Sequence, residues 1–123
     1  MLLFYRPRKG HRTRWNGGGK VGIYECPIVV NRAGSRDSRV HETQKPEKLF
    51  LEITSDFSDV GELVLDPFCG SGTTGVAALK LGRRFLGFEQ KANHYDTALQ
   101  RLSAAAEGQT VSEFLGKQSK LFG

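Results

Sequence analysis

A glycine-rich turn follows a short apolar run in this chain, and an acid stands between them. The apolar run is 63–65, the acid is Asp66, and the turn carries Gly70, Gly72 and Gly75. Glycine has no Cβ, so its backbone can turn tightly and approach a ligand closely. An apolar run, a turn and an amphipathic run in that order are typical of a buried parallel strand that leads a ligand to a helix N-terminus. The turn is therefore the first candidate for a binding site.

The glycine spacing is compatible with more than one nucleotide-type ligand. It fails the phosphate-loop pattern G-x-x-x-x-G-K-[ST], because Val76 stands where that pattern has lysine. It matches the dinucleotide pattern G-x-G-x-x-G, with Glu89 further along to bind a ribose. Asp66 opposes that second ligand, since a phosphate charge ~6 Å away would cost roughly 3 kcal/mol at an effective dielectric of ~20. The same carboxylate favours an ammonium or sulfonium group, so the residues favour S-adenosylmethionine over NAD.

A second motif places the chain among known proteins. It is His41-Glu42-Thr43-Gln44-Lys45-Pro46, and it precedes Asp66-Pro67-Phe68-Cys69-Gly70-Ser71-Gly72 and Gly87-Phe88-Glu89. With these motifs the chain resembles the C-terminal portion of a β-class DNA amino-methyltransferase, a family that methylates adenine N6 or cytosine N4. The resemblance extends from about Arg39 to Leu102, although the family commonly has proline where this chain has Glu42.

The resemblance implies a fold, a cofactor and a set of binding residues. The fold is α/β, a partial Rossmann-like methyltransferase fold with a central, mostly parallel sheet, and the cofactor is S-adenosylmethionine. Thr43 and Lys45 would lie near the carboxylate end of the cofactor, and Glu89 would accept its ribose hydroxyls. A helix cap is the structural alternative for Thr43, and a solvated turn is the alternative for Glu89. The predicted cofactor-binding residues are Thr43, Lys45, Asp66, Pro67, Phe68, Gly70, Ser71, Gly72, Thr73 and Glu89.

The family's chemistry needs a loop that this sequence lacks. In the family a D-P-P-[YFW] tetrapeptide upstream holds the amine of a flipped base and stacks an aromatic ring on it. No such tetrapeptide occurs here, and Asp66-Pro67-Phe68 belongs to the cofactor turn. We therefore predict no catalytic residue and no metal site, and expect the S-adenosylmethionine-binding half of a site-specific DNA methyltransferase, inactive without a complementary segment. A non-catalytic cofactor- or DNA-binding remnant is the alternative, and an NAD-binding domain is a more distant one.

Positive charge is concentrated in the first part of the chain. Residues 1–48 carry eleven Lys/Arg against four Asp/Glu, and the rest carries seven against nine, which together gives the net +5. Basic side chains around an aromatic ring suit a phosphate backbone and a stacked base, so double-stranded DNA is the expected partner. A solvated arm is the alternative. The predicted DNA-binding residues are Arg6, Arg8, Lys9, Arg12, Arg14, Trp15 and Lys20.

The 123 residues are expected to form a single, partial methyltransferase domain. Its predicted parts are a basic DNA-facing segment at 1–40, a cofactor-binding βαβα core at 41–106 and a loose tail at 107–123. No apolar run is long enough for a membrane span, and Cys26 and Cys69 form no metal pattern, so a reduced cytoplasmic location is expected. Unpaired strand edges would favour a homodimer or pairing with a complementary N-terminal methyltransferase chain.

The elements that must position these residues can also be predicted. Short strands are expected at 2–6 and at 22–31, and a strand is expected at 63–66. Pro46 fits the first turn of a helix whose Leu49, Ile53 and Phe57 form a buried stripe. A second helix should follow the glycine turn and stop at Gly82, before a strand at 83–89. A last helix, capped by Asn93, should pack on the sheet through Ala98, Leu99, Leu102 and Ala105.

Overall fold

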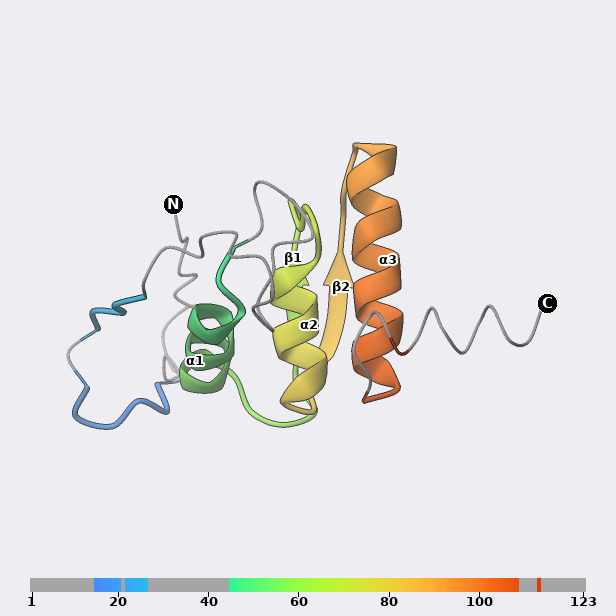
Figure 1. Ribbon diagram of the computed structural model, residues 1–123. Helices are drawn as coiled ribbons and strands as arrows, with labels where there is room; N and C mark the ends of the chain where they lie inside the picture. Colours follow the sequence, from blue (N-terminus) through green and yellow to red (C-terminus); the bar gives the residue numbers. More distant parts are fainter. Residues whose placement is uncertain (1–14, 21, 27–44, 109–112, 114–123) are drawn as a thin grey trace, which may run out of the picture.

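The structure is a computed structural model that describes residues 15–20, 22–26, 45–108 and 113. Its elements are α1 (Glu47–Phe57), β1 (Leu63–Asp66), α2 (Thr73–Lys80), β2 (Arg84–Gly87) and α3 (Ala92–Ala106) (Figure 1). The two strands are parallel, with Leu63 opposite Arg84 and Asp66 opposite Gly87. Because parallel strands need a crossover connection and α2 supplies it, these elements form a β-α-β unit. The predicted α/β class with a parallel sheet is confirmed.

Helix α2 is the centre of the described fold. It contacts both strands, α1 on one side and α3 on the other. Figure 1 shows the three helices side by side with α2 in the middle. The residues buried at this centre are small, and they are Val76, Ala77, Ala78, Ala98 and Ala104. Gly75 has the tightest surroundings, because a Cβ there would lie 2.5 Å from atoms of both Leu102 and Phe85. The absence of a side chain at Gly75 lets α2 approach α3 and β2 closely.

The face of the sheet that points away from α2 is exposed and carries leucine side chains beside Arg84. Side chains alternate between the two faces of a strand, and both strands show alternating exposure. On the open face, Leu63, Leu65 and Leu86 are 53%, 59% and 46% exposed. Val64 and Phe85 occupy the alternate positions and are less exposed. Among the described residues, therefore, helices cover one face of the sheet and leave a row of leucines on the other.

Helix α1 begins as predicted but buries different residues. It starts at Glu47, directly after Pro46. The predicted stripe of Leu49, Ile53 and Phe57 is only half-buried. The buried residues are Thr54 and Asp56, and Lys20 and Tyr24 of the N-terminal segment bond to the Asp56 carboxylate. The sequence period of four residues did not reveal these buried positions.

Two predictions for the last helix are wrong. Helix α3 begins at Ala92 after Lys91, with no side-chain cap, so Asn93 is not its cap. It packs on α2 rather than on the sheet, and Leu99 is exposed. The buried positions are Ala98, Arg101 and Ala104. The reason is that Ala98 packs against Gly72 at the start of α2, which places the helix beside α2 instead of over the strands.

Other predicted elements agree in part. Helix α2 ends at Lys80, and Gly82 has the positive φ of +73° expected at such a stop. The second strand is shorter than 83–89, and residues 22–26 form no strand although one was predicted at 22–31. The predicted strand at 2–6, Thr43 and most of the predicted tail lie outside the described residues. No helix in the described part of the chain is long and apolar enough to cross a membrane.

Candidate cofactor-binding site

Asp66 organises the glycine turn from the end of β1. One carboxylate oxygen accepts a hydrogen bond from the backbone N–H of Phe68 at 3.0 Å. The other accepts one from the hydroxyl of Thr74, in the first turn of α2, at 2.6 Å. A carboxylate at this point also interacts favourably with the positive end of the helix dipole. The strand end, the turn and the helix start are therefore tied together by a single side chain.

The turn itself needs glycine at two positions. Gly70 and Gly72 have φ of +54° and +79°, a region that other residues adopt rarely. The N–H of Gly72 donates to the carbonyl of Cys69 at 2.8 Å. The carbonyl of Gly72 accepts a hydrogen bond from the N–H of Val76 at 2.9 Å. The N–H of Cys69 donates to the carbonyl of Phe88 at 3.0 Å, which joins the turn to the residue that follows β2. The predicted role of the glycines in shaping a tight turn agrees with this geometry.

Glu89 lies at the same edge of the sheet as Asp66. Asp66 pairs with Gly87, and Glu89 follows two residues later. Its carboxylate accepts a hydrogen bond from the N–H of Lys91 at 2.8 Å. That bond is the main reason why the pKa of Glu89 falls below its ordinary value, and the N–H of Gly70 acts in the same direction. Glu89 is therefore anionic at neutral pH, and two carboxylates lie on either side of the glycine turn.

A hollow of about 430 Å³ lies beside Glu89, within the size range of small-molecule sites. Three aromatic side chains line it, and all three are exposed: Phe68 at 89%, with Phe88 and Tyr95 each more than half exposed. Exposed aromatic rings beside an anionic acceptor are suited to a ligand with a flat ring and neighbouring hydroxyls. The sequence indicated Phe68 and Glu89, but it did not indicate Phe88 or Tyr95 as part of this site.

Arg101 reaches the turn from α3. Its Nη1 donates to the carbonyl of Ser71 at 2.6 Å, to the Ser71 hydroxyl at 3.1 Å and to the Thr73 hydroxyl at 3.2 Å. Thr73 is buried, so its hydroxyl faces the protein. Sequence reasoning missed Arg101 and also Thr74. A signal was present for Arg101, which lies three residues after Ala98 and hence on the apolar face of its helix.

The remaining predicted cofactor residues are less well defined. Pro67 lines the hollow. Lys45 is exposed just before α1, and Thr43 lies outside the described residues. The predicted contacts of these residues with a cofactor, like those of Ser71 and Thr73, stay predictions. What the structure brings together is Asp66, the turn and Glu89.

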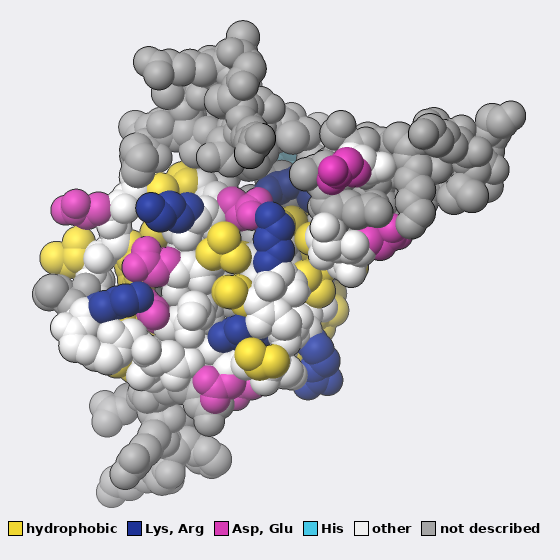
Figure 2. Space-filling view, turned by 60° about the horizontal axis from the view of Figure 1, so that its bottom comes forward, with side chains coloured by type: hydrophobic (Ala, Val, Ile, Leu, Met, Phe, Trp, Pro, Cys, Tyr) yellow, Lys and Arg dark blue, Asp and Glu magenta, His cyan; other side chains and the backbone are white. Residues whose placement is uncertain are grey.

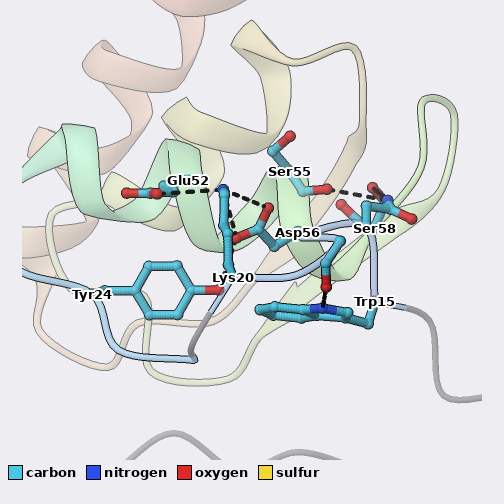
Figure 3. Close-up of polar contacts among 9 residues, drawn as sticks. Trp15, Lys20, Tyr24, Glu52, Ser55, Asp56 and Ser58 are labelled. Carbon is cyan, nitrogen blue, oxygen red and sulfur yellow. Dashed lines mark hydrogen bonds and ion pairs between the residues drawn. The ribbon is translucent and has the colours of Figure 1, made fainter.

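Residues 15–20 and 22–26 form an N-terminal segment that is docked on α1 (Figure 3). The ring of Trp15 packs edge-on against Phe57 with centroids 5.1 Å apart, and its indole N–H donates to the carbonyl of Gly18. Lys20 forms an ion pair with Asp56 at 3.1 Å, and the Tyr24 hydroxyl donates to the same carboxylate at 2.9 Å. Asp56 is only 3% exposed, and its hydrogen bond to Lys20 is the main cause that raises the pKa of Lys20.

These contacts bear on the predicted DNA-binding residues. Trp15 and Lys20 are engaged within the protein, while Arg6, Arg8, Lys9, Arg12 and Arg14 lie outside the described residues. Figure 2 looks onto the lower end of the molecule and shows acidic and basic side chains interspersed there. On that face, the described residues therefore present no continuous basic stripe of the kind that follows a phosphate backbone. A DNA contact by the seven predicted residues stays a prediction.

Comparison with known proteins decides the family. A family model described as DNA methylase matches residues 3–100. The chain belongs to the DNA methylase family. Among curated DNA methylases, the Type II methyltransferase M2.DpnII of Streptococcus pneumoniae is 48% identical over 67 residues, 54% of this chain and 25% of that protein. The Type II methyltransferase M.HinfI of Haemophilus influenzae is 38% identical over 82 residues, 67% of this chain and 23% of that protein.

A solved structure supports the fold of this DNA methylase chain. The crystal structure of the M1.HpyAVI–SAM complex matches with a TM-score of 0.59 and 34% identity, over 76% of this chain and 46% of that one. The resemblance to DNA amino-methyltransferases and the partial Rossmann-like fold are thus confirmed. The chain spans about a quarter of the length of the two curated relatives.

Proposed function

We propose that the chain forms the S-adenosylmethionine-binding part of a DNA methyltransferase that methylates an exocyclic amine of adenine or cytosine. One observation carries the proposal: Asp66 and Glu89 lie on either side of a glycine turn at one edge of a parallel sheet. Membership of the DNA methylase family and the likeness to a SAM-complexed relative support it. We also propose a cytoplasmic location, because the chain belongs to a family of DNA methylases and DNA is the proposed substrate.

The electrostatics of the turn favour this cofactor over NAD. S-adenosylmethionine carries a sulfonium, an ammonium and a carboxylate, hence a net positive charge. Asp66 already occupies the start of α2, the position where a phosphate would otherwise bind, through its contact with Thr74. A phosphate ~6 Å from either carboxylate would be disfavoured by roughly 3 kcal/mol at an effective dielectric of ~20. A cation at the same place would be favoured by a similar amount.

Each part of the cofactor has a group suited to it. The adenine ring would lie among Phe68, Phe88 and Tyr95, and Glu89 would accept the ribose hydroxyls. Lys45 has the charge to bind the cofactor's carboxylate. When bound, the cofactor supplies an activated methyl group. The chain's own residues would bind and orient that group, which can supply a large part of the acceleration in a transfer reaction.

The base-binding side of the reaction would come from elsewhere. The sequence contains no D-P-P-[YFW] tetrapeptide, so we propose that the chain is inactive without a complementary methyltransferase segment. The exposed leucines at positions 63, 65 and 86 support this, because a row of apolar side chains on a sheet face favours burial against another layer. A second copy of the chain would be the alternative cover. Double-stranded DNA is the proposed substrate.

Calorimetric titration with S-adenosylmethionine and with NAD tests the cofactor. We expect measurable binding of S-adenosylmethionine and weaker or no binding of NAD; tighter NAD binding would refute the assignment. Methyl transfer is tested with labelled cofactor and double-stranded DNA, with and without a candidate N-terminal segment. Label should enter DNA only when both segments are present. Incorporation by the chain alone would contradict the proposed need for a complement, while cofactor binding without any transfer would favour a non-catalytic binding module.

A further inference from the structure

Arg101 is a buried cation that contacts neutral oxygens of the glycine turn. Its side chain comes from the middle of α3, and the residue is 5% exposed. The three acceptors, at 2.6 to 3.2 Å, are the carbonyl and hydroxyl of Ser71 and the hydroxyl of Thr73. Burial lowers the pKa of Arg101, and the charge of Glu47 opposes that shift. The guanidinium nevertheless stays charged, because arginine does not deprotonate in proteins.

Packing alone does not explain an arginine at this position. The same face of α3 carries Ala98, which packs on Gly72, and Leu102, which lies against Gly75. An apolar side chain at position 101 would continue that face without removing a charge from water. Burying a charged group is unfavourable unless its hydrogen bonds are satisfied. The three bonds to the turn are therefore the property that distinguishes arginine here.

Those bonds fix a peptide plane at the centre of the turn. The carbonyl of Ser71 and the N–H of Gly72 belong to one planar peptide unit, so holding one orients the other. That N–H donates to Cys69, and the Gly72 carbonyl accepts from Val76 at the start of α2. Ser71 lies between Gly70 and Gly72, both with positive φ, and glycine has the largest backbone freedom to lose. An external restraint on Ser71 therefore has a large effect on the shape of the turn.

We propose that Arg101 is a positioning residue that holds the glycine turn in its ligand-binding shape without touching the ligand. The identity of that ligand rests on the proposed function, whereas the ordering of the turn does not. Arg101 acts through Ser71 and Thr73, so two residues predicted as direct cofactor contacts serve, in this proposal, to transmit order from α3 to the turn.

Arg83 provides a matched control. It is also a buried arginine, at 9% exposure, and its guanidinium donates to the hydroxyl and carbonyl of Ser58 at 3.1 and 2.7 Å and to the carbonyl of Leu81. Its acceptors lie beyond the C-terminal ends of α1 and α2, away from the glycine turn. Arg101→Lys and Arg83→Lys each replace a planar fork of donors with a single ammonium that cannot reproduce its geometry. Global destabilisation would affect both variants alike.

The test measures amide hydrogen exchange and cofactor affinity in the full-length protein. In ligand-free protein, Arg101→Lys should speed exchange at the Gly72 and Val76 amides about tenfold relative to the amides of residues 103–106 in α3, where neither arginine donates a hydrogen bond. Arg83→Lys should leave that ratio unchanged. Affinity for S-adenosylmethionine should fall about tenfold in Arg101→Lys, equivalent to about 1.4 kcal/mol, and less than about twofold in Arg83→Lys. Urea unfolding of both variants reports their global stability.

Equal acceleration in the two variants, or an unchanged exchange ratio in Arg101→Lys, would overturn the proposal. If Arg101→Lys does not fold, Thr73→Val removes one acceptor and leaves the guanidinium in place. It should raise the exchange ratio of Gly72 about threefold, and no rise would count against the proposal. A wild-type protein that fails to bind S-adenosylmethionine would refute the proposed function, while the exchange ratios would still decide the role of Arg101.

Discussion

The carboxylate of Asp66 and the hydroxyl of Thr74 meet across the glycine turn at 2.6 Å. This contact joins the last residue of β1 to the first turn of α2. It gives Asp66 a structural task in addition to the electrostatic one that the sequence indicated. The turn is thus held from two sides, by Asp66 and Thr74 at the strand end and by Arg101 from α3.

Removal of the Thr74 hydroxyl should loosen the turn. Thr74→Val keeps the shape of the side chain and deletes its hydrogen bond to Asp66, so the free energy of unfolding should fall by about 1 kcal/mol. Affinity for S-adenosylmethionine, measured by calorimetry, should fall severalfold as well. Thr97→Val is the control, since that hydroxyl donates to a carbonyl within α3 and not to the turn. Equal loss of affinity in the two variants would exclude a specific role for the Thr74 contact.

Glu89 should make stability depend on pH in acid. The pKa of its carboxyl lies below the ordinary value of 4.5, chiefly because of the Lys91 N–H. A group whose pKa is lower in the folded state stabilises the protein fully above the unfolded pKa. That contribution is lost as pH falls through 4.5 and then through the folded value. Urea unfolding at several values between about pH 6 and about pH 3 should show this loss of stability in the wild-type protein. The loss should be smaller in Glu89→Gln.

The control for this pH experiment is Glu25→Gln, which changes an exposed carboxylate outside the candidate site. It should keep the wild-type decline in stability with acid. Cofactor binding provides a second measurement, because Glu89→Gln should also lower the affinity for S-adenosylmethionine, whereas Glu25→Gln should not. Identical acid profiles of wild type and Glu89→Gln would show that the Lys91 contact has no influence on folding.

Phe68 should matter for binding and not for folding. Its side chain is 89% exposed, so Phe68→Ala should change the free energy of unfolding by no more than about 0.5 kcal/mol. Loss of an aromatic surface for the adenine ring should weaken the binding of S-adenosylmethionine by about 1 kcal/mol, which is roughly fivefold in affinity. Phe57→Ala is the converse control, since Phe57 packs on Trp15 and should affect stability without affecting affinity. Unchanged affinity in Phe68→Ala would remove this residue from the site.

Gly75 should be intolerant of even one methyl group. A Cβ at that position would lie 2.5 Å from Leu102 and from Phe85, so Gly75→Ala forces α2 away from α3 and β2. We expect destabilisation of about 1–3 kcal/mol by urea unfolding, typical of overpacking. Gly19→Ala is the control, because nothing lies within 4 Å of a Cβ there. A neutral Gly75→Ala would mean that the helices can separate without loss of stability.

The open sheet face should respond to a complementary segment. Leu65→Ser and Leu86→Ser place a hydroxyl on a face that is already half exposed, so the isolated chain should lose little stability. Each substitution should weaken the binding free energy for a candidate N-terminal methyltransferase segment by about 1 kcal/mol or more. Analytical ultracentrifugation measures this association. Lys48→Ser on an exposed position of α1 is the control. Association unaffected by both leucine changes would place the complement on another surface.

Local chemistry explains which parts of the fold were predictable. The strand at Leu63 follows from an apolar run. The turn at Gly70 and the helix end at Gly82 follow from glycines, which adopt a positive φ easily; both signals are properties of short stretches. The packing of α3 was not predictable in the same way, because its apolar face fits either a sheet or a helix. The partner was decided by Gly72 and Gly75, whose missing side chains leave room for Ala98 and Leu102 of α3 to pack closely.

In the candidate site too, some residues could be predicted from the sequence and others could not. Asp66 and Glu89 could be found from sequence because Asp66 ends one strand and Glu89 follows the end of its parallel partner, and the ends of parallel strands share an edge. Thr74 and Arg101 could not, because their role depends on which oxygen each one faces in three dimensions. The docking of Lys20 on Asp56 joins residues that are distant in sequence, so this ion pair could not be predicted from the basic side chains around Trp15.

The place of Trp15 has a practical consequence. It is the only tryptophan in the chain, and its indole packs on Phe57, the last residue of α1. Its fluorescence therefore reports release of the N-terminal segment from that helix, and circular dichroism reports loss of the helices themselves. Comparing the two signals along one titration would separate detachment of this arm from collapse of the whole domain, without any added label.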